Sequence, residues 1–122
     1  MQLRDRRKTG DSGEDFAVRY LEENGYSIIE RNYQKAGGEI DIIAKQAGDL
    51  VFIEVKAWSA VSEQELEYSV NLRKKRNIIR TAEKYIYENL KDDEVSVRFD
   101  IVYIALPEKR VVLYQSAFYA DG

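Results

Sequence analysis

Three charged residues interrupt two apolar stretches in the middle of the chain. Asp41 lies in the stretch EIDIIA, and Glu54 and Lys56 lie in the stretch LVFIEVKA. Two carboxylates beside an ammonium group are the side chains that metal-dependent hydrolysis of a phosphodiester needs. Carboxylate oxygens bind hard divalent cations, and a lysine stabilises the charge that develops on a phosphate. These residue types therefore predict a phosphoryl-transfer site, if the fold brings them together.

The pairing of the two stretches decides whether the charges meet. A two-residue turn at residues 47–48 would join them as a hairpin, with Asp41 opposite Glu54 and with Glu54 and Lys56 on one face. In this register the apolar residues share the other face: Ile40, Ile42, Ile53 and Val55. A shift by one residue would mix charge into that apolar face, which is strongly unfavourable where the face is buried. The pattern therefore predicts this register.

Two carboxylates directly opposite each other destabilise a hairpin unless a cation or a proton lies between them. The chain has no Cys and no His, so the usual zinc sites and His-based acid–base catalysis are excluded, and a metal would be held by oxygen. We therefore predict Mg²⁺ or Mn²⁺ bound by Asp41 and Glu54, with the carbonyl of Val55 or water completing the coordination. Lys56 would then point toward the phosphate held by the metal.

Glu14 and Asp100 are two further acidic residues of interest. Glu14 lies on the apolar stripe of an expected helix, so it would lean toward the sheet and could assist metal binding, directly or through water. The alternative is a favourable interaction with the positive end of the helix dipole. For Asp100, in the apolar run FDIVYI, a structural hydrogen-bonding role is favoured because an unpaired buried charge is costly. Asp41 alone could equally be a surface residue, and an E-x-K pattern alone is commonly a solvated salt bridge.

Basic residues could hold a nucleic-acid backbone beside such a site. The run RKKRNIIR carries Arg73, Lys74, Lys75 and Arg76, and Trp58 directly follows the lysine strand, where it could stack on a base. The alternatives without a binding role are that the basic run forms a solvated helix face and that Trp58 is buried. The net charge of −3 argues against a protein that coats nucleic acid through its overall field, so a local basic patch is needed.

The elements that position these residues follow from periodicity and from Gly and Pro. We expect helices at about residues 13–24 and 65–90, the second either continuous or broken near Asn71, and strands at 26–33, 39–44, 50–57, 95–106 and 110–115. The order α-β-β-β-α-β-β is typical of an α/β domain in which helices pack on one mixed sheet. The 122 residues suit a single domain, with about residues 1–10 flexible. The sequence shows neither a long apolar run nor a signal-peptide pattern, which predicts a cytoplasmic protein without membrane contact.

With these residues in place, the sequence resembles the YraN-like family of small bacterial proteins, which is related to archaeal Holliday-junction resolvases. The resemblance covers most of the chain through GEDFAVRYLEENGYSIIERNY, GGEIDIIA, VFIEVKA, RFDIVYI and SAFYA. It implies a restriction-endonuclease-like (PD-(D/E)XK) fold, whose nucleases use an acid followed by (Asp or Glu)-x-Lys at positions that fall on Asp41, Glu54 and Lys56. Glu14 matches the acidic residue of the first helix, and Lys74 matches a lysine of the long helix.

One departure from the family pattern concerns phosphate contacts. The family commonly continues the lysine strand with a polar residue and an arginine, whereas this chain has Ala57 and Trp58. The resemblance implies a Mg²⁺- or Mn²⁺-dependent endonuclease acting on DNA, including branched or single-stranded forms, and related resolvases act as homodimers. Two alternatives stay open: a non-catalytic nucleic-acid-binding protein on the same fold, and a protein-interaction module.

Overall fold

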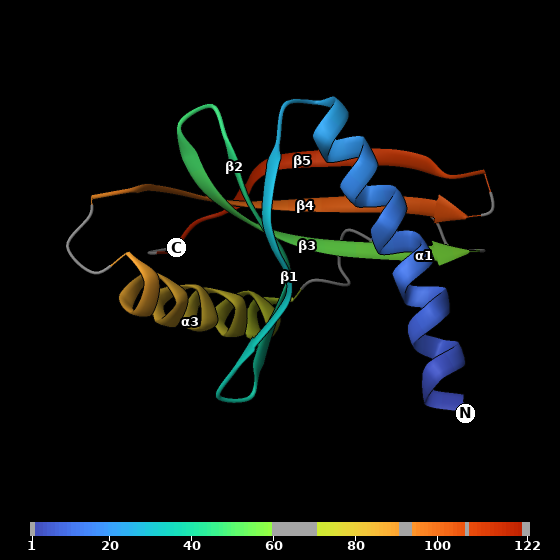
Figure 1. The fold of residues 1–122 in the computed structure, drawn as a ribbon, viewed down its shortest axis with the longest axis horizontal. Coiled ribbons are helices and arrows are strands. Elements are labelled where there is room, and N and C mark those ends of the chain that lie inside the picture. Colours follow the sequence, from blue (N-terminus) through green and yellow to red (C-terminus); the bar gives the residue numbers. More distant parts are fainter. Residues whose placement is uncertain (1, 60–70, 91–93, 107, 121–122) are drawn as a thin grey trace.

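The computed structural model describes residues 2–59, 71–90, 94–106 and 108–120, with side chains for 13–57, 71–90, 94–105 and 108–120. Its elements are α1 (Gln2–Glu23), β1 (Ser27–Lys35), β2 (Gly38–Gln46), β3 (Asp49–Ser59), α3 (Leu72–Asn89), β4 (Ser96–Leu106) and β5 (Arg110–Phe118) (Figure 1). The expected α/β class is confirmed. The predicted helical segment at residues 65–70 lies outside the described part of the chain.

The five strands form one mixed sheet in the order β1-β2-β3-β4-β5. Neighbouring strands are antiparallel except β3 and β4, which are parallel. A parallel pair needs a long crossover connection, and α3 lies in that connection. The antiparallel hairpins need only short turns, which contain Gly37, Ala47 and Gly48 at φ values of 84°, 54° and 84°. The sheet is therefore a hairpin meander extended by one crossover.

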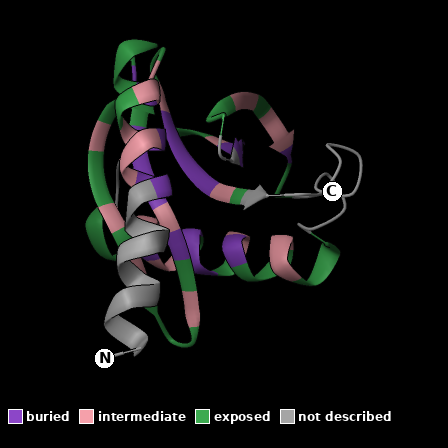
Figure 2. Ribbon diagram, turned by 90° about the vertical axis from the view of Figure 1, so that its right-hand side faces the viewer, coloured by how far each residue is buried: buried purple, intermediate pink, exposed green. Residues whose placement is uncertain are grey.

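The two helices pack on opposite faces of this sheet. Ala17 and Leu21 of α1 belong to one buried cluster, together with Ile53 of β3. Ile78 and Tyr85 of α3 belong to a second cluster on the other face. Figure 2 shows the buried residues along the central strands and the inner sides of both helices. Each face of the central sheet therefore has its own apolar core. Among the described residues, neither helix is long and apolar enough to cross a membrane.

The helix α1 begins at Gln2, so the predicted start at about Gly13 is wrong. The sequence suggests a start there because Asp11 or Ser12 could cap a helix ahead of the periodic apolar residues. In the structure Gly13 lies inside the helix, and a Cβ atom added there would lie 3.2 Å from Cβ of Ala57 on β3. The glycine therefore permits close packing of α1 on the sheet, and it does not mark the end of an element.

The helix α3 begins directly after Asn71, the position of the alternative break. The Asn71 side chain accepts a hydrogen bond from the backbone N–H of Lys74 at 3.0 Å, which is the usual cap of a helix start. The first turn of α3 contains no acidic residue, so no negative side chain in this turn offsets the partial positive charge of its N–H groups or the charge of Lys74. This end of α3 is therefore suited to anions.

The predicted register of the β2–β3 hairpin is confirmed at its closed end, where Ile42 pairs with Ile53. Beyond this pair the prediction that Ile40 shares a face with Ile42 is wrong. Ile40 packs in the α3-side cluster, whereas Ile42 packs in the α1-side cluster. Asn32 of β1 has φ 55° and lies between the partners of Ile42 and Ile40, so the hairpin bends there and directs Ile40 toward α3. Asp41 lies at this bend.

Candidate active site on the α3 side of the sheet

Asp41 and Glu54 meet where the β2–β3 ladder ends. Oδ2 of Asp41 accepts a hydrogen bond from the backbone N–H of Val55 at 2.8 Å, so the side chain replaces a backbone partner. Glu54 is only 5 % exposed, and its carboxyl group lies close enough to Asp41 to raise the pKa of that residue. The expected meeting of these carboxyl groups therefore occurs through their side chains, although the backbone ladder stops before them.

Two lysines reach the same carboxyl pair from different elements. Nζ of Lys74, on the first turn of α3, lies 2.7 Å from Oε2 of Glu54, and Nζ of Lys56, on β3, lies 4.0 Å from the same oxygen. The Asn71 cap fixes the first turn of α3 and thereby the position from which Lys74 extends. The structure thus brings together two carboxyl groups and two amines from β2, β3 and α3.

A cavity of about 390 Å³ opens in front of this cluster. It lies between the β1–β2 turn and the start of α3, and its lining includes Asp41, Glu54, Arg73 and Lys74. The turn lies close to the helix because position 38 is a glycine: a Cβ atom there would collide with the side chain of Thr81 on α3. The glycine pair of the GGEIDIIA segment therefore serves the shape of this cavity.

Glu14 approaches the cluster from α1. It is 8 % exposed, and its Oε1 accepts hydrogen bonds from Nε of Arg31 at 3.1 Å and from Nδ2 of Asn32 at 3.0 Å. Its negative charge contributes to the raised pKa of Asp41, so the two groups are within electrostatic reach. Sequence reasoning does not identify Arg31 and Asn32, because nothing in their spacing along β1 distinguishes them from surface residues.

The site changes the ionisation of its members. Burial, followed by the negative charge of Glu54, raises the pKa of Asp41 from 3.8 to about 8. Burial, followed by the positive charge of Lys74, lowers the pKa of Lys56 below its usual value. For Lys74 burial acts in the same direction, but the hydrogen bond and charge of Glu54 outweigh it and raise the pKa of this lysine. The cluster therefore holds a proton on its carboxyl pair near neutral pH.

We expect the stability of the metal-free protein to fall as the pH rises from about 5 to about 8. In this range the folded state retains a proton on the Asp41 carboxyl group that the unfolded state has already lost, so deprotonation favours unfolding. The Asp41 carboxyl group contributes at most about −1.4 kcal/mol per pH unit to the slope of the unfolding free energy against pH. Urea unfolding with a chelator present measures it. Asp41→Asn should flatten the profile, whereas Glu39→Gln, at an exposed neighbour on β2, should leave it unchanged.

The other predicted residues separate into two groups. Arg73 lines the same cavity as Asp41, whereas Lys75 and Arg76 line a different hollow on the opposite side of α3. Trp58 lies in β3, but its side chain is outside the described residues. Val55 contributes its N–H group to Asp41. The basic run RKKRNIIR is therefore divided between two surfaces of one helix.

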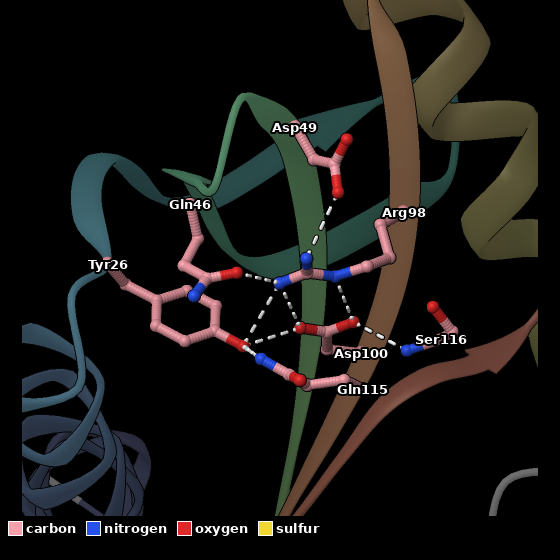
Figure 3. A network of polar contacts seen from close by, with 7 residues as sticks. All are labelled: Tyr26, Gln46, Asp49, Arg98, Asp100, Gln115 and Ser116. Carbon is pink, nitrogen blue, oxygen red and sulfur yellow. Dashed lines mark hydrogen bonds and ion pairs between the residues drawn. The ribbon is translucent and has the colours of Figure 1, made fainter.

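Asp100 has the structural hydrogen-bonding role that the sequence favours. It is fully buried in β4 and accepts hydrogen bonds from the Tyr26 hydroxyl at 2.8 Å and from the Ser116 N–H at 2.9 Å. Arg98 donates to both oxygens of Asp100, at 3.0 and 3.1 Å (Figure 3). The same guanidinium donates to Asp49 and Gln46 at the β2–β3 turn. This network joins the four strands β2, β3, β4 and β5 and lies apart from the candidate site.

The donor set of the candidate site suits a hard cation with few protein ligands. Asp41 and Glu54 supply oxygen atoms of the kind that Mg²⁺ and Mn²⁺ prefer, and their mutual repulsion is relieved here by a proton, by lysine and by the N–H group of Val55. Among the residues that the structure describes, no cluster of three or more Asp, Glu, His or Cys side chains is arranged to hold a metal ion. Binding would therefore rely on two carboxylates together with water or a substrate phosphate, which is common for Mg²⁺.

The chain is similar to bacterial proteins over nearly its whole length. It is 39% identical over 112 residues to a UPF0102 protein of Clostridioides difficile strain 630, covering 92% of this chain and 97% of that protein. It is 39% identical to a UPF0102 protein of Ralstonia pickettii, with coverage of 93% and 92%, and 43% identical to one of Persephonella marina, with coverage of 78% and 81%. Residues 13–104 match the family described as "Uncharacterised protein family UPF0102". The chain therefore belongs to the UPF0102 (YraN-like) family.

Proposed function

We propose that this protein is a Mg²⁺- or Mn²⁺-dependent endonuclease that hydrolyses phosphodiester bonds in DNA, including branched or junction DNA. The observation that carries the proposal is the meeting of Asp41 and Glu54 with the amines of Lys56 and Lys74 at one cavity. An acidic pair that retains a proton near neutral pH is a costly arrangement for a structural site. It is a suitable arrangement for a cation that takes the place of the proton.

A bound Mg²⁺ or Mn²⁺ would be held by the carboxylates of Asp41 and Glu54, and it would supply positive charge for the phosphate and acidify a coordinated water. The carbonyl of Val55 and the carboxylate of Glu14 are the further oxygen groups at hand. Glu14 already accepts hydrogen bonds from Arg31 and Asn32, so its contribution would pass through water. These oxygen groups fit a metal ion whose coordination shell is completed by the substrate.

The two lysines have different parts in the proposed reaction. Burial and the charge of Lys74 lower the pKa of Lys56, and we assign this lysine to the attacking water and the phosphate, where it either takes a proton from the water or stabilises the charge that develops on the phosphate. Hydrolysis forms one bond between water oxygen and phosphorus and breaks one P–O ester bond, and the departing oxygen gains a proton from solvent. Lys74 and the start of α3 attract the phosphate, because they carry only positive charge at this end of the helix.

The finer fold assignment is also part of the proposal. The described elements follow the order helix, three strands, helix and two strands, with a parallel β3–β4 pair at the centre of the sheet. The acid of β2 and the E-x-K of β3 meet at one end of this sheet, as the restriction-endonuclease-like fold requires. These features support that fold.

A second candidate is a nucleic-acid-binding protein that keeps the fold without turnover. One observation favours it: Lys74 contacts Glu54 at 2.7 Å and the carboxyl pair shares a proton, so the cluster is neutralised without metal. In that case the charges would stabilise the fold and the cavity would bind phosphate without hydrolysing it.

Calorimetric titration with Mn²⁺ and cleavage assays test the proposal. The wild type should bind Mn²⁺ more tightly as the pH rises toward about 8, because the metal must displace the proton shared by the carboxyl pair. Asp41→Ala should abolish that binding, while Glu39→Gln, at an exposed acid of the same cavity, should preserve it. Junction, flap, single-stranded DNA and RNA substrates should then show which nucleic acid is cut.

The outcomes separate the candidates. Equal Mn²⁺ binding by the wild type and Asp41→Ala would remove this metal site. Binding of the substrates without cleavage in any divalent metal would favour the second candidate. If the protein neither binds nor cuts nucleic acid, both candidates are wrong and a protein-interaction role is favoured.

A further inference from the structure

A second hollow, of about 510 Å³, lies on the side of α3 that faces away from the candidate active site. It is formed between α3 and the end of β5, and it combines basic, aromatic and aliphatic side chains. Its lining consists of Leu72, Lys75, Arg76, Ile79, Arg80, Phe118, Tyr119 and Ala120. The helical residues recur at intervals of three and four, so they form a continuous stripe along α3.

The charge of this hollow is unbalanced. Lys75, Arg76 and Arg80 contribute three positive charges, and among the residues that the structure describes no acidic side chain lines the hollow. Nζ of Lys75 lies 5.7 Å from the centre of the Phe118 ring, and Arg80 donates a hydrogen bond to Asn77. Within the described part of the chain, none of the three cations is in a salt bridge. In a protein with a net charge of −3, this local excess of positive charge indicates an anionic partner.

Two exposed apolar side chains in the same hollow narrow the chemistry of that partner. Tyr119 is 66 % exposed and Leu72 is 57 % exposed. A tyrosine ring beside cations suits an unpaired nucleobase whose phosphates contact the cations, because every base has a face that can stack on an aromatic ring. A base inside a duplex is already stacked on its neighbours. The combination therefore favours a single strand over a double helix.

The position of the hollow connects it to the candidate site. Arg73, Lys74 and Asn77 line the first cavity, while Lys75 and Arg76 line the second hollow, so the width of one helix, about 10 Å, separates the two. We propose that an unpaired strand of nucleic acid, continuous with the strand in the active site, crosses the start of α3 and binds in this hollow. The continuity rests on the proposed nuclease function, whereas strand binding in the hollow is an independent claim.

Fluorescence anisotropy with a labelled oligothymidylate of about 12 nucleotides, in the presence of a chelator, tests strand binding without cleavage. Tyr119→Ala should weaken binding at least about fivefold, and Tyr119→Phe should retain it, because the ring remains. Tyr87→Ala is the matched control, since Tyr87 is 79 % exposed on α3 but outside the hollow. The wild type should also prefer the single strand to a blunt duplex of the same length.

The salt dependence tests the cations separately. If Arg76 and Arg80 contact phosphates, the double variant Arg76→Gln/Arg80→Gln should reduce the slope of log K against log salt by about 1.4. Lys45→Gln, at an exposed lysine of β2, should leave the slope unchanged. Circular dichroism confirms that each variant is folded.

Two results would overturn the inference: Tyr119→Ala binds the strand as the wild type does, or the salt slope is the same in the double variant. Such a result would leave the nuclease proposal standing if junction DNA is still cut with Mn²⁺. Conversely, weakened strand binding by Tyr119→Ala without cleavage of any substrate would support the strand site and overturn the nuclease proposal.

Discussion

In the proposed nuclease, replacing Lys56 with glutamine is expected to lower the rate of DNA cleavage by about 10²–10³-fold while Mn²⁺ binding persists. Lys56 is not one of the carboxylates proposed to bind the metal. Its Nζ lies 4.0 Å from Glu54 Oε2, at the edge of the cluster where a scissile phosphate would enter. The loss should therefore appear in kcat more than in KM, because the ammonium acts on charge that develops during the reaction. Single-turnover cleavage and Mn²⁺ calorimetry on the same preparation measure the two quantities.

Lys56→Arg distinguishes the two ways in which the lysine could act. Arginine keeps the positive charge but cannot release its proton, so it should restore part of the rate if charge stabilisation dominates. If proton transfer dominates, Lys56→Arg should be as slow as Lys56→Gln. Lys45→Gln, at an exposed lysine of β2, serves as the control and should cleave at the wild-type rate. Full activity in Lys56→Gln would contradict the assigned role of this residue.

Replacing Arg98 with methionine is expected to destabilise the protein by about 3–5 kcal/mol. Arg98 supplies the only cation that contacts Asp100 within the described residues, and the Asp100 side chain is completely buried. Without the guanidinium, a buried carboxylate would retain the hydrogen bonds of Tyr26 and Ser116 but no compensating charge. Urea unfolding at neutral pH measures the loss.

The double variant Arg98→Met/Asp100→Asn separates the charge from the packing. The amide preserves the shape of Asp100 but has no charge to compensate, so the double variant should be more stable than Arg98→Met alone. If it is not, the loss in Arg98→Met comes from the contacts of the guanidinium with Gln46 and Asp49. Mn²⁺ binding at the distant carboxyl pair should remain in both variants.

The hairpin that carries the candidate site could be predicted from the sequence because its constraints are local. The Ala47–Gly48 turn and the alternation of apolar residues determine the pairing of Ile42 with Ile53, and that pairing is observed. Once Ile53 faces the core of α1, Glu54 must face the opposite side of the sheet. The direction of the key carboxylate therefore follows from a pattern of a few residues.

The features that could not be predicted depend on packing between distant segments. Asn32 adopts a positive φ at the point where Ile40 turns toward α3, and nothing near Asn32 in the sequence indicates this. The hydrogen bonds of Glu14 with Arg31 and Asn32 depend on how α1 lies on β1. The predicted start at about Gly13 is wrong because a capping residue in the sequence, Asp11 or Ser12, is compatible with a helix start without requiring one, and α1 begins at Gln2.

The division of the basic run on α3 follows from helical geometry. Successive residues of a helix differ in direction by about 100°, so a run of four basic residues turns most of the way around the helix and cannot face one surface as a whole. The structure places Lys74 at Glu54 and Lys75 over the Phe118 ring. Plotting the run on a helical wheel separates the directions of Lys74 and Lys75. The sequence is therefore sufficient to predict two basic surfaces, although the composition of the run suggests a single basic patch.

The parallel pairing of β3 with β4 orders the folding of the chain. Strands β1, β2 and β3 are joined by short turns and can pair early, whereas Asp49 and Ser96, partners in the parallel ladder, are distant in sequence and pair late. Asp41 and Glu54 belong to the early hairpin, while Lys74 arrives only with the crossover helix. The hairpin therefore brings the two carboxyl groups together before α3 supplies the cation that neutralises Glu54.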